Sequence, residues 1–430
     1  MKAVRTMRKV FTILLVLFPF LCQFGLPVKV PVLTAHFSIG YLVLLPFALV
    51  WCLLKIPTEG IFRIKTYRFS GYFLFLLAVA FSAVLARGKS YYSGSGALLD
   101  LGIMLLFWLI VLYASRDVFN VRFGMAVYST LAVIFAAYFI VQFLVFRIKG
   151  IYLPTIFREN YVFGGEYVDA FRATGTPTSL FTTTSGFTFF CLPAVAFLLL
   201  WDRIGFNGRE FISAVVVSAA LALTGDIKTI VALAIVWGLF VFSILAYFVV
   251  HPYDGMYRFT HQRPSRIVLQ IVFPLLAVGT AAALLARKGR FSRLFAAFKG
   301  MLRDHALISG FEAAGQAGDH GTVVRYLGCG VGNAKAFLAS CGIELPAHMN
   351  AIGYVFLSVG FIGLILFIGS LFALLSTRRG KFGFAMAALL LFAAVFGNIV
   401  FLDTSFFWLM LAFTANDNTE MSFRKFLRVR

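Results

Sequence analysis

Charged side chains are scarce in this sequence, and acidic ones are the scarcest. Only 13% of the 430 residues are charged, and 38 Lys and Arg residues stand against 17 Asp and Glu residues. Soluble globular domains carry about 25% charged residues, so an ordinary soluble fold is excluded. The sequence also lacks internal repeats and low-complexity linkers. Nothing in it therefore divides the chain into separate domains.

Long apolar runs fill most of the chain instead. Hydrophobic residues make up 61% of it, mean hydropathy is +0.92, and Phe alone contributes 52 residues. Many runs are long enough to cross the ~30 Å hydrocarbon core of a bilayer as helices. The sequence thus predicts an all-α fold, a polytopic transmembrane helical bundle of about 12 spans that forms one membrane domain over residues 1–430. The spans are expected at roughly 10–26, 37–54, 69–86, 97–114, 124–146, 180–201, 210–225, 227–250, 267–286, 350–376, 382–400 and 402–415.

The distribution of Lys and Arg predicts the side of the membrane on which each loop lies. The basic start "MKAVRTMRK" precedes an apolar run without a small-residue cleavage site, so this run is expected to remain as a signal anchor. Segments on the side of the N-terminus hold most of the Lys and Arg residues, and the short segments opposite hold few. By the positive-inside rule both termini are cytoplasmic. Two long loops, about 147–179 and 287–348, then face the outer side.

These two outer loops carry cations that membrane anchoring does not require. The cations predict an anionic partner at the outer surface, such as phosphate or pyrophosphate on a lipid. Nucleic acid is unsuited as a partner, because the chain has no soluble basic domain to present to it. Within the second loop, "RFSRLFAAFKGMLR" (290–303) predicts an amphipathic helix in the membrane interface, with Arg303 among its cations.

Arg172 is the first candidate for binding that anion. It lies at the end of the first long loop, in "FRATGTPTSLFTTTSGF", before an apolar span and close to Gly175 and a run of hydroxyls. Arginine grips phosphate through two parallel hydrogen bonds, which makes it the side chain best suited to this task. The alternative is an interfacial arginine that only anchors the span.

A second candidate lies in the very short outer turn of the hairpin "LALTGDIKTIVAL". Asp226 and Lys228 are close to hydrocarbon there, where charges are costly unless they are paired or used. Lys228 is predicted to place another cation over the outer site. The alternative is that Asp226 and Lys228 simply neutralise each other.

The segment "RYLGCGVGNAKAF" (325–337) supplies glycines late in the second loop. It is not a dinucleotide fingerprint, because no strand–helix–strand unit surrounds it. A flexible backbone near Arg325 predicts amides that approach an anion. An oxidising outer compartment would permit a disulfide between Cys329 and Cys341, but two free thiols are the favoured interpretation.

His348 and Asn350 end the second long loop, in "LPAHMNAIGYVFLSVGFIG". Histidine is the usual general base near neutral pH, so His348 is the candidate for activating a hydroxyl. The alternative is an interfacial ring that bonds a loop carbonyl. Gly360 and Gly363 share one face of the following helix, where missing side chains would allow a neighbouring helix to approach.

In this order the motifs resemble the bacterial polysaccharide polymerase and O-antigen ligase superfamily, the Wzy and WaaL proteins. The resemblance covers the chain from about residue 124 onward, through "RATGT", "TGDIK", "GCGVGN" and His-x-Asn before "VGFIGLILFIG". It implies glycosyl transfer at the periplasmic face of the bacterial inner membrane, from a glycan carried on undecaprenyl pyrophosphate, without metal or another cofactor. Membrane lipid and a chain-length regulator protein are the further expected partners.

The resemblance assigns roles to particular residues. His348 matches the family's histidine, Arg172 matches its arginine, and Lys228 stands where the family commonly has arginine. Met349 separates His348 from the polar residue that ligases place directly after the histidine, which favours a polymerase. The expected substrate contacts are Arg172, Lys228, Arg325 and Asn350, with His320, Arg303, Asp226 and Glu166 in reserve.

Two other functions remain open at this point. One is an O-antigen ligase, which would pass the glycan to lipid A core. The other, from a different class, is a lipid-linked glycan flippase or transporter. Ion-coupled transporters carry ionisable residues deep within their spans, whereas Asp100 is nearly alone here, so coupled transport is disfavoured.

Overall fold

A computed structural model describes ten segments of the chain and a few further positions. Every regular element in these residues is an α-helix. The described residues are 2–21, 23–24, 39–40, 70–92, 119–151, 177–181, 184–200, 208–250, 322–343 and 351–376, with a few positions in 42–53 and single residues elsewhere. The helices are α1 (Lys2–Leu21), α3 (Ser70–Ala86), α6 (Val121–Lys149), α8 (Thr184–Leu200), α9 (Gly208–Leu223), α10 (Ile227–Val250), α16 (Thr322–Leu327), α17 (Ala334–Ser340) and α18 (Ala351–Ser376).

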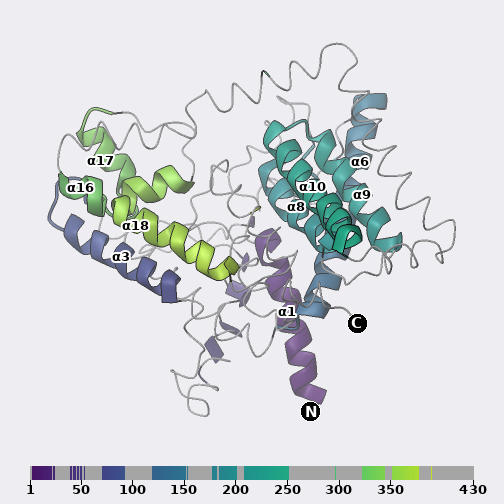
Figure 1. Cartoon of the computed structure of the whole chain (residues 1–430), viewed down its shortest axis with the longest axis horizontal. Helices are drawn as coiled ribbons and strands as arrows, with labels where there is room; N and C mark the ends of the chain where they lie inside the picture. The colour runs from purple at the N-terminus through teal and green to yellow at the C-terminus, as the bar shows by residue number, and fades with distance from the viewer. Residues whose placement is uncertain are drawn as a thin grey trace.

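These helices lie in two groups (Figure 1). In the first, at the left, α3, α16 and α17 pack against α18. In the second, at the right, α6, α8, α9 and α10 pack together, and α1 lies against α6. One cluster of buried apolar side chains includes residues of both groups, from Phe75 and Phe367 in the first to Phe190 and Val217 in the second.

Local sequence explains where α6 begins and ends. The side chain of Asn120 accepts a hydrogen bond from the Phe123 amide at 3.2 Å and caps the first turn. Gly150 adopts the left-handed conformation that commonly ends a helix, with φ of 66°, and its amide donates to the Phe146 carbonyl. The backbone amide of Asn120 also donates to the Thr12 hydroxyl at 3.0 Å, which fixes the start of α6 on α1.

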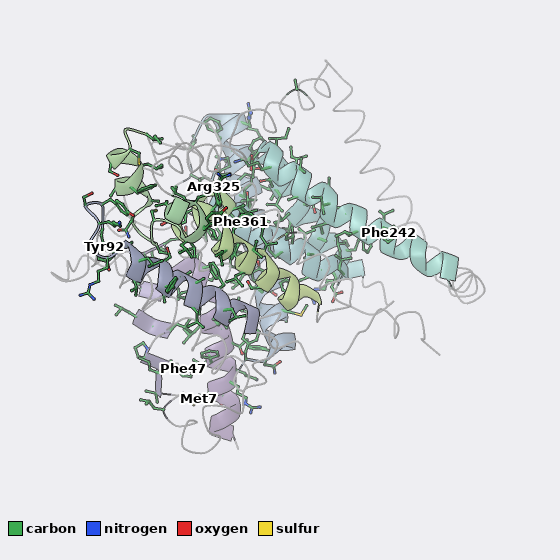
Figure 2. All side chains as sticks on the ribbon, turned by 60° about the vertical axis from the view of Figure 1, so that its left-hand side comes forward. Met7, Phe47, Tyr92, Phe242, Arg325 and Phe361 are labelled. Atoms are coloured by element: carbon green, nitrogen blue, oxygen red, sulfur yellow. The ribbon has the colours of Figure 1, made fainter. Side chains whose placement is uncertain are left out.

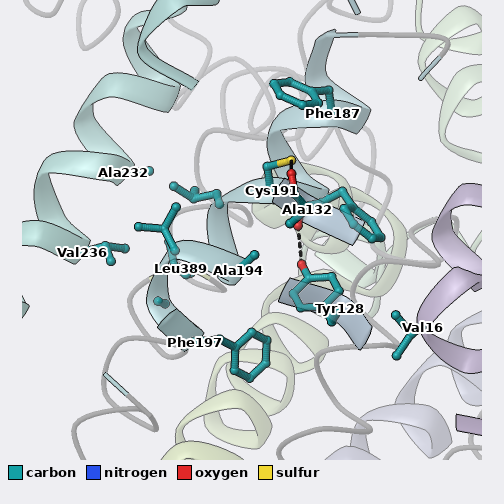
Figure 3. Packing of buried hydrophobic residues seen from close by; sticks show 14 of the residues in the cluster. Val16, Tyr128, Ala132, Phe187, Cys191, Ala194, Phe197, Ala232, Val236 and Leu389 are labelled. Atoms are coloured by element: carbon teal, nitrogen blue, oxygen red, sulfur yellow. Dashed lines mark hydrogen bonds between the residues drawn. The ribbon is translucent and has the colours of Figure 1, made fainter. Parts of the chain in front are cut away.

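Aromatic side chains form the centre of the second group (Figure 3). Phe139 of α6 and Phe187 of α8 stack with ring centroids 4.7 Å apart. Tyr128 is fully buried, and its hydroxyl donates to the carbonyl of Phe190. A buried phenol requires such a partner, so this bond fixes the register of α6 against α8 in addition to the packing.

Several predicted spans coincide with described helices. The spans at 69–86, 124–146 and 227–250 correspond to α3, α6 and α10. Two helical stretches are long and apolar enough to cross a membrane, Phe123–Lys149 and Ile352–Ser370. The described part of the chain is therefore mostly helical, and two of its helices are long and apolar enough for a membrane. The spans expected at 97–114, 267–286, 382–400 and 402–415, and the amphipathic helix at 290–303, lie outside the described ranges.

Candidate functional site

Three of the predicted site residues belong to the described part of the chain, namely Asp226, Lys228 and Arg325. The others lie outside it, and their roles remain predictions: Arg172, His348, Asn350, His320, Arg303 and Glu166. These three residues lie in two places, the α9–α10 hairpin and the region where α16 contacts α18.

In the hairpin, Asp226 caps the first turn of α10. One carboxylate oxygen accepts the Lys228 amide at 3.3 Å, and the other accepts both the amide of Thr229 at 3.3 Å and its hydroxyl at 2.7 Å. The Thr229 hydroxyl also lies 3.3 Å from the hydroxyl of Thr188 on α8. A carboxylate suits this position because it satisfies free amides at the positive end of the helix. Asp226 thus has a structural role that its interpretation as a counter-charge did not include.

Replacing Asp226 by alanine is expected to lower the free energy of unfolding by about 0.5–2 kcal/mol, the usual value of an N-cap. Asp226→Asn keeps an oxygen acceptor and is the matched control, which we expect to retain most of that stability. Thermal unfolding of the detergent-solubilised protein measures both. An alanine variant that melts with the wild-type protein would show that the cap contributes nothing.

The structure places Lys228 and Arg325 in different helix groups. Lys228 is half-buried in the first turn of α10, and Arg325 is exposed on α16. In Figure 1, α10 lies at the right of the molecule and α16 at the left. These two predicted phosphate-binding cations are therefore not brought together, and Arg325 is the one on the side of α18.

α18 is interrupted where α16 touches it. Gly360 has φ of 75° and ψ of −173°, a conformation that is almost exclusive to glycine. The peptide between Tyr326 and Leu327, at the end of α16, lies so close that a Cβ at Gly360 would come within 3.0 Å of it. Figure 2 shows Arg325 near Phe361, the first residue after this break.

The glycine loop, residues 328–333, continues along the same stretch of α18. Gly328 has φ of 80°, and a Cβ there would overlap the peptide between Ser358 and Val359. The amide of Cys329 donates to the Leu357 carbonyl at 3.0 Å, and the next amide donates to the Ser358 carbonyl at 2.9 Å. Main chain therefore packs on main chain, with hydrogen bonds between the two segments.

These contacts change two sequence-based interpretations. Amides of the glycine-rich backbone near Arg325 were expected to approach an anion, but those of Cys329 and Gly330 bond to carbonyls of α18. Gly360 and Gly363 were expected to share a face of one continuous helix. Instead Gly360 ends the regular helix, and a Cβ at Gly363 would meet Val359 of α18 itself. Helical periodicity assumes regular dihedral angles, which a positive φ at Gly360 interrupts.

The end of the first long loop is anchored inside the second helix group. Ser179 is fully buried and has a positive φ of 58°, and its hydroxyl donates to the Phe135 carbonyl at 2.7 Å. Gln142 donates to the Ser179 carbonyl at 3.3 Å, and the ring of Phe181 packs 5.3 Å from that of Phe135. Residues 177–181 are thereby fixed on α6.

Cys329 and Cys341 are free thiols in the structure, in agreement with the favoured interpretation. Cys329 is fully buried in a small apolar cluster with Phe337 and Leu357. Burial raises the pKa of the Cys329 thiol to about 12. A thiol with so high a pKa stays protonated near neutral pH and is a poor nucleophile for disulfide formation.

The sequence did not predict several hydrogen bonds between distant residues, most notably those of Ser82, Ser179 and Gln142. Hydroxyls in apolar helices usually bond to their own helix, as Ser129 and Ser370 do here. Sequence alone therefore gave no signal that Ser82 or Ser179 bonds elsewhere. Among the described residues, no three His, Cys, Asp or Glu side chains gather in a group that could hold a metal.

A scan of protein-family models and a search of curated proteins match nothing to this chain. Any assignment to a family therefore depends on the motifs of the sequence. To these motifs the structure adds the contacts of α16 and the glycine loop with α18.

Proposed function

We propose that this chain is a multi-pass protein of the bacterial inner membrane that polymerises oligosaccharide repeat units carried on undecaprenyl pyrophosphate. The transfer takes place at the periplasmic face, and both termini are cytoplasmic. Its product is an O-antigen or exopolysaccharide chain. The reaction is a glycosyl transfer that uses no metal.

The observation that carries this proposal is the order of the motifs, which ends with His348 and Asn350 directly before α18. The contact between α16 and α18 supports it, because the helix that bears Arg325 rests on the helix that His348 leads into. In this proposal the base precedes α18 in the sequence, and the phosphate-binding cation lies on α16, which contacts α18.

In the proposed reaction, a hydroxyl of the acceptor sugar attacks the anomeric carbon of the donor glycan. The bond between that carbon and the pyrophosphate oxygen breaks, and the lipid pyrophosphate leaves with the bonding electrons. His348 takes the proton of the attacking hydroxyl. Asn350 orients either the base or the acceptor.

The departing pyrophosphate gains negative charge, which cations fixed in advance can stabilise by several kcal/mol in a site that excludes water. Arg172 and Arg325 are assigned this role, because guanidinium groups bind phosphate oxygens in pairs. Lys228 lies in the other helix group and contributes to the positive field that attracts the anionic lipid.

Arg172→Ala is expected to abolish polymer formation, and Arg172→Lys to retain a partial rate. The lysine keeps the charge but loses the two parallel hydrogen bonds. Arg147→Ala is the matched control, because Arg147 lies in the last turn of α6, at the other end of the same connection, and its guanidinium lies 5.3 Å from the centroid of the Phe143 ring, as an anchoring arginine would. The measurement is the amount and length of glycan in membranes that contain equal amounts of each protein. Near-normal polymer from Arg172→Ala would reduce Arg172 to an anchor as well.

A further inference from the structure

Three segments of the chain meet at the carbonyl of Ser358, two residues before the break in α18. This carbonyl accepts a hydrogen bond from the Ser82 hydroxyl of α3 at 2.8 Å and another from the Gly330 amide of the glycine loop at 2.9 Å. Both serines are buried, with exposed fractions of 1% and 0%. α3 and the glycine loop therefore share one anchor on α18.

Close packing holds the loop at the same place. A Cβ at Gly330 would lie 2.9 Å from the Cβ of Ala86 on α3 and 2.8 Å from the side-chain nitrogen Nδ2 of Asn333. Asn333 is fully buried, and its side-chain amide donates to the Cys329 carbonyl at 3.4 Å. The loop thus fits between α3 and α18, with no room for a side chain at position 330.

The bond of Ser82 differs from those of Ser129 and Ser370, two other serines in apolar helices. Ser129 and Ser370 bond to carbonyls three or four residues away in their own helices, which adds nothing to tertiary structure. Ser82 instead bonds to a residue 276 positions away. It reaches the one stretch of α18 on which α16 and the glycine loop both rest.

We propose that Ser82 is a positioning residue for the transfer reaction, one that acts through Arg325 by holding the glycine loop, and hence α16, on the broken stretch of α18. This inference rests on the proposed function. Ser82 itself touches no substrate. When its hydroxyl is removed, the Ser358 carbonyl loses one of its two donors, and α16 and its arginine become less firmly placed.

The first experiment tests the anchor without using the reaction. In a chain whose only cysteine is Cys329, a maleimide labels this buried thiol only when the loop leaves α18. Loss of one buried hydrogen bond should make labelling about three- to tenfold faster in Ser82→Ala. Ser358→Ala is the matched control, because its carbonyl remains and its hydroxyl has no hydrogen-bond partner among the described residues. Equal labelling of Ser82→Ala and the wild-type protein would overturn the proposal.

The second experiment tests the route through Arg325, with initial rates of polymer formation in membrane vesicles. We expect Ser82→Ala to lower the rate about three- to tenfold at normal abundance, and to lower it no further in an Arg325→Lys background, because residues that act as a unit are not additive. Faster labelling with an unchanged rate, or additive effects of the two substitutions, would leave Ser82 a structural residue only. A wild-type chain that makes no polymer would overturn the proposed function, while the labelling result would still describe the anchor.

Discussion

Gly360→Ala is expected to remove most of the folded protein from the membrane. An alanine at φ of 75° and ψ of −173° is strained by about 1–3 kcal/mol. Its Cβ would also overlap the Tyr326–Leu327 peptide, and overpacking of this kind costs about 1–3 kcal/mol more. Main chain cannot rotate away as a side chain can, so α16 would have to leave α18. Membrane abundance and thermal unfolding of the purified protein measure the effect.

Two other glycines separate the sources of this effect. Gly88 has φ of 88° but open space around it, so Gly88→Ala should show strain alone, about 1–2 kcal/mol. Gly369 lies within α18 with nothing near its Cβ position, and Gly369→Ala should be neutral or stabilising by up to about 1 kcal/mol. Wild-type abundance and melting of Gly360→Ala would contradict the break in α18.

His348→Ala is expected to have the largest effect on the proposed reaction. Loss of a general base typically lowers a rate by ~10²–10⁴-fold, so single repeat units should accumulate on the lipid carrier. His348→Gln should fare little better, because an amide keeps hydrogen bonding but cannot take the proton. The measurement is a gel of glycan length, with the membrane abundance of each variant determined alongside.

His305→Ala serves as the matched control, because His305 belongs to the same long loop and has no assigned role. We expect it to make polymer of normal length. Long polymer from a normally abundant His348→Ala protein would rule out the base and return His348 to an interfacial histidine that bonds a loop carbonyl.

The helices of this protein could be predicted from sequence better than their irregularities. The apolar runs at 210–225 and 350–376 correspond to α9 and α18, because long runs without helix-breaking proline favour a continuous helix. The break at Gly360 was not predicted, since it depends on contact with residues 326–328. Those residues are more than 30 positions away, outside any local pattern.

The candidate site was predictable only in part, for a similar reason. The sequence marked Asp226 as a charge in a tight turn, and its position before α10 fits an N-cap, a role that local sequence can reveal. It also marked the glycine-rich segment after Arg325 as special, but the amides of Cys329 and Gly330 bond to carbonyls of α18. Tertiary structure decides which acceptor a backbone amide bonds to, and the residue type does not reveal that acceptor.

The bond between Ser82 and Ser358 also constrains how the chain is made. The two residues are 276 positions apart, and translation proceeds at about 5–20 residues per second, so Ser82 emerges about 15–55 s before its partner. During that interval α3 has been synthesised, but α18 and the loop that packs against Ala86 have not. Its pairing face must therefore be protected, by lipid or by an insertase, until synthesis nears its end. A chain that ends before α18, through stalling or truncation, leaves that face of α3 exposed. Such an exposed face is a feature by which quality-control proteases can recognise an incomplete chain.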